Sequence, residues 1–167
     1  MKRNRNRIKQ LSIIALMSVA MVSCTPKGKK IKVINEETSI NQINNKSMSA
    51  IEMNKAMFLE KVANYETNPS EFKYLGDKPA IIDFYATWCG PCKAMSPVID
   101  EMAEKYGDKL VVYKIDVDKE GELAGLFHVQ SIPTLLFIPM NGQPQISVGA
   151  ISKANLQDAV TSVLGLK

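Results

Sequence analysis

The order of structural patterns along this 167-residue chain predicts an α/β fold, with helices on both faces of a central mixed β-sheet. From residue 49 onward, segments typical of strands and helices follow in the order βαβαβαββα. Strands separated by helices form the parallel part of such layered folds. Near the C-terminus, two apolar runs flank Asn141-Gly142, a strong signal for an antiparallel hairpin. Parallel strands and a hairpin together make the sheet mixed.

The first half of the predicted domain begins with a short strand at residues 49–53. Asn54 is a suitable N-cap for the helix that follows. Apolar residues at helical spacing extend this helix to Asn68-Pro69, because proline disfavours the helical conformation in the residue before it. After a loop, residues 80–86 are apolar except for Asp83, as is typical of a strand buried on both faces.

The second half supplies the remaining strands and helices. The expected elements are a helix at about 92–106, a strand at 110–117, a short helix at 120–127, strands at 134–138 and 145–148, and a final helix after Ser152. Pro97 lies inside the long helix and is expected to kink it. Gly107-Asp108 ends that helix, and Ser152 caps the last one.

Charge is distributed unevenly along the chain. Residues 1–24 contain five basic residues and no acidic one, and residues 25–50 contain five lysines and two glutamates. From residue 51 onward there are 11 lysines and 15 acidic residues, so the predicted domain is mildly acidic. Nucleic-acid binding requires a basic surface. We therefore expect no nucleic-acid partner.

The N-terminal 23 residues predict a secretory signal peptide. A basic segment precedes an apolar run at residues 11–22, which is too short to span a membrane. Residues 21–24 resemble the lipobox of bacterial lipoproteins, although Met21 stands where Leu, Val or Ile is usual. The resemblance implies cleavage before Cys24, lipidation of Cys24 and a membrane anchor. The alternatives are conventional cleavage near Ala20 or Ser23, which would release a soluble periplasmic protein, and, least favoured, an uncleaved anchor.

Residues 24–48 predict a flexible tether, because they are polar and lack aromatic residues. The folded domain is then expected at residues 49–167. Lipidation of Cys24 would also remove the odd thiol, which could otherwise pair wrongly in an oxidising compartment.

The chemistry of the chain is concentrated at residues 88–92, Trp-Cys-Gly-Pro-Cys. This segment lies between a predicted strand and a predicted helix, so Cys89 lies at a helix N-terminus and Cys92 one turn inside, on the same face. Unpaired N–H groups and the helix dipole there lower the pKa of Cys89. The resulting thiolate can attack a disulfide, and the second thiol can resolve the mixed disulfide.

Two structural interpretations of this cysteine pair are weaker. A zinc site needs two more ligands, and the chain offers only the distant Cys24 and one histidine, His128. A purely structural disulfide would gain little stability from closing so short a loop. We therefore expect no metal and no cofactor.

The cysteine motif and five further blocks resemble the thioredoxin family. The blocks are residues 82–86, 88–93, Pro97, 112–118, 132–137 and 148–153, in family order and with family spacing. The resemblance implies the thioredoxin fold. It also implies that Cys89 is the nucleophile and Cys92 the resolving thiol, and that Gly90-Pro91 sets the redox poise, as in the reducing members.

The same resemblance implies a substrate groove beside the cysteines. Pro133 matches the family's cis-proline, and a cis bond would present the backbone of Ile132 to an extended substrate strand. Trp88, Ile132, Gly149 and Ala150 would form the apolar rim. Core packing is the alternative role for these rim residues.

Asp83 is the residue that a purely structural interpretation explains least. A carboxylate in a buried strand is costly unless it is paired or protonated. The resemblance implies that it relays the proton of Cys92 and that Lys114 is its charged neighbour. The alternatives are a solvated Asp83 at a sheet edge and an ordinary surface lysine at Lys114.

The sequence thus predicts a lipid-anchored thiol–disulfide oxidoreductase at the periplasmic face of the cell envelope. It would reduce disulfide-containing envelope proteins through Cys89 and Cys92. A membrane thiol reductase would supply its electrons, because exported proteins have no direct access to cytoplasmic NADPH. Two alternatives remain: a disulfide-donating oxidase that uses the same pair, and a non-catalytic tethered chaperone or adaptor.

Overall fold

The computed structural model describes residues 49–167 and confirms a mixed five-stranded sheet with helices on both faces. The predicted signal peptide, the tether and Cys24 lie outside the described residues. The elements in chain order are β1 (Ile51–Glu52), α2 (Lys55–Lys61), β2 (Ala80–Tyr85), α3 (Gly90–Tyr106), the 3-10 turn η1 (Gly107–Lys109), β3 (Val111–Asp116), α4 (Gly121–Leu126), β4 (Thr134–Ile138), β5 (Gln145–Val148) and α5 (Lys153–Ser162).

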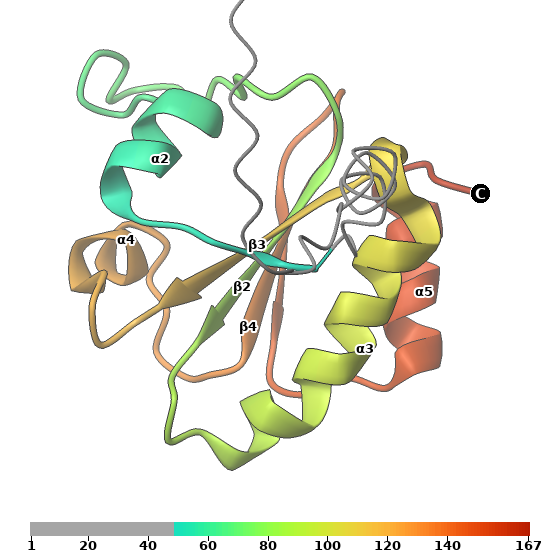
Figure 1. Ribbon diagram of the computed structural model, residues 1–167. Helices are drawn as coiled ribbons and strands as arrows, with labels where there is room; N and C mark the ends of the chain where they lie inside the picture. Colours follow the sequence, from blue (N-terminus) through green and yellow to red (C-terminus); the bar gives the residue numbers. More distant parts are fainter. Residues whose placement is uncertain (1–48) are drawn as a thin grey trace, which may run out of the picture.

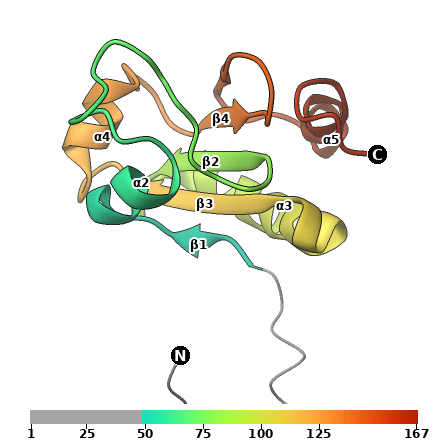
Figure 2. The ribbon, with the colours of Figure 1, turned by 90° about the horizontal axis from the view of Figure 1, so that it is seen from above.

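The strand order of the sheet is β1-β3-β2-β4-β5, with β2 in the centre. The β1–β3 and β2–β3 pairs are parallel, and the β2–β4 and β4–β5 pairs are antiparallel. Helices α3 and α5 cover one face of the sheet, and α2 and α4 lie on the other (Figures 1 and 2). Because β2 and β4 are antiparallel, the C-terminal end of β2 and the N-terminal end of β4 lie side by side, near the start of α3. None of the helices within residues 49–167 is long and apolar enough to cross a membrane.

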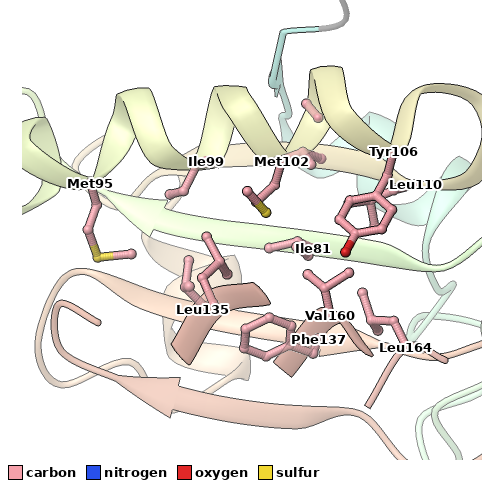
Figure 3. Packing of buried hydrophobic residues seen from close by; sticks show 13 residues of the cluster. Ile81, Met95, Ile99, Met102, Tyr106, Leu110, Leu135, Phe137, Val160 and Leu164 are labelled. Carbon is pink, nitrogen blue, oxygen red and sulfur yellow. The ribbon is translucent and has the colours of Figure 1, made fainter. Parts of the chain in front are cut away.

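Two hydrophobic cores lie on opposite faces of β2, because successive strand residues point to opposite sides. Ile81 belongs to the core under α3 and α5, and Ile82 and Phe84 belong to the core under α2 and α4. Figure 3 shows the first core, in which α3 side chains meet the sheet and α5. Its labelled members are Ile81, Met95, Ile99, Met102, Tyr106, Leu110, Leu135, Phe137, Val160 and Leu164.

Helix α3, which follows the cysteine motif, begins two residues earlier than predicted, at Gly90 instead of Cys92. Pro91 lies in its first turn, where its fixed backbone angle suits a helix start. The helix then continues through Pro97 to Tyr106. The predicted caps of α2 and α5 are confirmed, since the side chains of Asn54 and Ser152 accept backbone N–H groups at the helix starts.

Helix α2 is shorter than predicted, because it ends at Lys61 and not at Asn68-Pro69. The carbonyl of Val62 accepts a hydrogen bond from the N–H of Leu75, 2.9 Å away, which pulls the chain out of the helix. Residues 64–68 instead form a separate turn, in which the side chain of Asn64 accepts the N–H of Thr67 at 3.1 Å. A long-range contact has therefore overridden a local helical pattern.

Candidate redox site

The two cysteines of the motif form a disulfide at the start of α3, with their sulfurs 2.06 Å apart. Cys89 is the N-cap of the helix, and the backbone N–H of Cys92 donates to the Cys89 sulfur at 3.1 Å. Both cysteines are buried, while Gly90 and Pro91 between them are exposed. When the bond is reduced, the helix N-terminus and this N–H favour a thiolate at Cys89.

The peptide bond between Ile132 and Pro133 is cis, in agreement with the family resemblance, and it faces the disulfide. The Cys89 sulfur lies 3.9 Å from the carbonyl oxygen of Ile132. The N–H of Gly149 donates to the carbonyl of Pro133 at 2.8 Å, which holds Gly149 and its neighbour Ala150 beside the cis bond. Segments 89–92, 132–133 and 149–150 are thus brought together from three parts of the chain.

Trp88 projects from this site and is 68% exposed. Its indole N–H donates to the carboxylate of Asp118 at 2.7 Å, which fixes the ring although it lies in solvent. Ile132 is half-buried and Ala150 is exposed. Asp118 was not among the predicted site residues. Its place next to Val117, in one of the resembling blocks, was the only signal for it.

Asp83 lies in β2, two residues after Ile81, so its side chain shares the face that α3 covers. It is only 1% exposed, so the alternative of a solvated edge residue is wrong. Its Oδ1 atom has no hydrogen-bond partner among the described residues. Burial raises the pKa of the Asp83 carboxyl from 3.8 to about 6, the charge of Lys114 lowers it, and the carboxylates of Glu52 and Asp100 add to the rise.

Lys114 lies directly opposite Asp83 on the neighbouring strand β3. Its Nζ atom donates to the hydroxyl of Ser96 at 3.0 Å and lies 4.5 Å from the centre of the Tyr85 ring. The ammonium is thus held by Ser96 and Tyr85 and lowers the pKa of Asp83 through its charge. Sequence reasoning missed Ser96, although it follows Cys92 by four residues and so shares its helix face.

A hollow of about 240 Å³ opens beside Cys92, with Ser96 and Lys114 in its wall. Its other lining residues are Tyr85, Ala86, Thr87 and Lys93. This hollow gives solvent a route to the resolving cysteine and the lysine near Asp83. Within residues 49–167, no cluster of three or more histidine, cysteine or carboxylate side chains is placed to hold a metal ion. Cys89 and Cys92, joined at the start of α3, form a pair that can exchange two electrons as dithiol and disulfide.

Comparison with known proteins supports the interpretation of Cys89 and Cys92 as a thiol–disulfide exchange site. The family model described as Thioredoxin matches residues 50–162. The thioredoxin of Borreliella burgdorferi is 42% identical over 116 residues, which are 70% of this chain and 98% of the relative. The thioredoxin of Bacillus subtilis is 46% identical over 84 residues, which are 50% of this chain and 81% of the relative.

Among solved structures, chloroplastic thioredoxin z superimposes with a TM-score of 0.59 at 24% identity. The match covers 71% of this chain and 96% of that one, and at this identity it supports the fold alone.

Proposed function

This chain belongs to the thioredoxin family and is a thiol–disulfide oxidoreductase, and we propose that it reduces disulfides in extracytoplasmic proteins from a lipid anchor at Cys24. The observation that carries the thiol–disulfide chemistry of the proposal is the Cys89–Cys92 pair at the N-terminus of α3, with a backbone N–H directed at the Cys89 sulfur. That geometry supplies a thiolate nucleophile and, one turn away, a thiol that can release it.

In the proposed reaction the reduced Cys89 thiolate attacks one sulfur of a substrate disulfide. A bond forms between Cys89 and that sulfur, and the other substrate sulfur leaves as a thiolate that takes up a proton. Cys92 then attacks the Cys89 sulfur as a thiolate, re-forming the Cys89–Cys92 bond and releasing the second substrate thiol. Two electrons pass from the enzyme to the substrate.

Asp83 is the proposed acceptor of the Cys92 proton. With a pKa raised to about 6, it is mostly ionised at neutral pH yet basic enough to take a proton. Burial on the α3 face supports this role, as does an Oδ1 atom that no residue between 49 and 167 hydrogen-bonds. Lys114, held by Ser96, keeps the pKa from rising further.

The direction and the location of the reaction come from the sequence. Gly90-Pro91 resembles the dipeptide of reducing family members, and the N-terminal 24 residues resemble a lipoprotein signal. Anchoring at Cys24 would place the domain at the periplasmic face of a membrane. Its partners there would be disulfide-containing envelope proteins, with a membrane thiol reductase as electron donor.

Trapping tests the mechanism and identifies the substrates. In Cys92→Ser the second attack is impossible, so mixed disulfides through Cys89 should accumulate and be recovered under acid-quenched, non-reducing conditions. Cys89→Ser/Cys92→Ser is the matched control and should trap nothing. Recovery of no mixed disulfide, or equal recovery from the control, would count against the reductase mechanism.

The redox state and location of the wild-type chain in cells test the rest of the proposal. Alkylation after acid quenching should find Cys89 and Cys92 mostly reduced, whereas a mostly oxidised pair would indicate an oxidase. Cys24→Ala should lose acyl labelling and move from the membrane fraction to the soluble fraction. Unchanged membrane association without acyl labelling would exclude the lipid anchor.

A further inference from the structure

We propose that protein substrates extend beyond the disulfide into an apolar trough along β5, where Ile146 selects an aliphatic side chain of an extended segment. The proposal rests on the thiol–disulfide activity described above and adds a specificity site to it. The trough has a volume of about 380 Å³. Phe127, Val129, Thr134, Ile146 and Val148 form much of its wall.

The exposed side chains of β5 are unusually apolar for the edge of a sheet. Ile146 and Val148 are 50% and 65% exposed and lie two residues apart in the strand, so they point to the same face. Edge strands are commonly protected by charged residues, and β5 carries none, whereas β1 at the opposite edge ends in Glu52. Within residues 49–167 no strand pairs with the outer side of β5, so its backbone groups and this pair of side chains are open to an incoming strand.

The trough adjoins a second hollow that lies next to the redox site. A second hollow of about 170 Å³ lies beside Trp88 and Ile132, at the rim of the disulfide. The two hollows share Val129, Gln130 and Ser131 as a common wall. A chain whose cysteine reacts at Cys89 can therefore pass over this wall and reach Ile146 without leaving the surface.

The common wall is held in place at both ends. His128 has a φ of 51°, which turns the chain sharply after α4, and the N–H of Val129 donates to the carbonyl of Ala124 at 2.9 Å. The hydroxyl of Thr134 donates to the carbonyl of Ser131 at 2.7 Å. The groove is thus preformed, which reduces the entropy lost when a substrate binds.

The chemistry of the trough defines its occupant. Phe127, Val129, Ile146 and Val148 supply its apolar wall, and its polar lining residues, His128, Gln130, Ser131 and Thr134, include no carboxylate, lysine or arginine. The trough therefore favours aliphatic side chains over acidic or strongly basic ones. An edge strand pairs with an extended backbone, and alternate side chains of that backbone enter the adjoining pocket. The occupant is therefore an extended polypeptide segment of the disulfide-bearing substrate, with aliphatic residues at alternate positions.

Kinetics with matched peptides test this site. Peptide disulfides are prepared in which a leucine pair, two residues apart, is moved stepwise away from the cysteine on either side, with serine in place of leucine as the reference. For the wild-type full-length chain, kcat/KM should be about tenfold higher for one leucine position than for its serine reference, the lower end of the discrimination that one apolar contact supplies. In Ile146→Ser this preference should disappear.

Two controls separate the trough from the redox centre. Ile51→Ser removes an equally large, 44% exposed side chain from the opposite edge strand and should leave the preference unchanged. A small aromatic disulfide, which cannot reach the trough, should be reduced at the wild-type rate by both variants. If Ile146→Ser folds poorly, Ile146→Thr preserves the branched strand residue and provides the same comparison.

Three results would overturn the proposal. One is an unchanged leucine preference in Ile146→Ser, and another is an equal loss in Ile51→Ser. The third is that Ile146→Ser differs from wild type in its concentration-dependent sedimentation but not in its leucine preference. This result would assign the trough to a second copy of the chain. Normal reduction of the small disulfide in these cases would leave the oxidoreductase function standing, whereas no reduction of any disulfide would overturn both.

Discussion

Replacing Asp83 by asparagine should stabilise the folded protein at neutral pH and not at acid pH. Burial raises the pKa of this carboxyl from 3.8 to about 6, so the folded state holds the proton more tightly than the unfolded state does. Between these two values the native state binds more protons, and stability falls as pH rises. Above pH 6 the cost of the buried charge is fully present, and below 3.8 it is absent.

The pKa difference sets the size of the effect. At about 1.4 kcal/mol for each pH unit, the interval from 3.8 to about 6 corresponds to about 3 kcal/mol. Asparagine has nearly the same shape and carries no charge. Urea unfolding of the oxidised protein should therefore show Asp83→Asn to be more stable than wild type by up to about 3 kcal/mol near pH 7.5, and by almost nothing near pH 3.5.

A second buried carboxylate provides the matched control. Asp116 is 4% exposed, but its oxygens are engaged by the N–H of Asp118 at 3.1 Å and by the ammonium of Lys119 at 3.2 Å. Asp116→Asn should therefore give no stabilisation at neutral pH. A gain for Asp83→Asn that is equal at both pH values would refute the reasoning, because packing and not charge would then be its source.

Three further predictions concern neighbouring residues. Lys114→Met removes the charge that lowers the pKa of Asp83, so the acidic limb of the pH–rate profile for disulfide reduction should move to higher pH; an unmoved limb would separate Lys114 from the reaction. Phe58→Ala removes a fully buried ring whose centroid lies 5.6 Å from that of the Phe127 ring. It should lower the free energy of unfolding in urea by about 3–5 kcal/mol. Trp88→Phe loses the indole hydrogen bond to Asp118 and should raise KM for peptide disulfides while leaving stability within about 1 kcal/mol; a large drop in stability would show a structural role instead.

The local sequence predicted the elements whose determinants are local. Asn54 and Ser152 were identified as caps because their side chains need only the next three residues to form the hydrogen bond. The burial of Asp83 also followed from its position in a continuous apolar strand. The hairpin of β4 and β5 followed from the turn between them.

The errors arose where distant parts of the chain meet. Helix α2 ends early because Leu75, thirteen residues away, takes the carbonyl of Val62. The bond from Ser96 to Lys114 joins α3 to β3, and the bond from Trp88 to Asp118 joins the motif to the segment after β3. No periodicity within a single segment encodes such contacts, so these partners became visible only in the folded structure.

The effect of Lys114 on the pKa of Asp83 depends on the register between β2 and β3. The hydrophobic pattern of either strand alone does not specify this register; the two patterns together do. In the β2–β3 pairing Asp83 faces Lys114, so both side chains lie on the α3 side of the sheet. A slip of one residue would turn Lys114 to the opposite face. Its charge would then be lost from the site, and Ile115 would be moved out of the α2 core, in which it is fully buried. Packing of that core therefore holds the register that keeps the lysine charge beside the buried carboxyl.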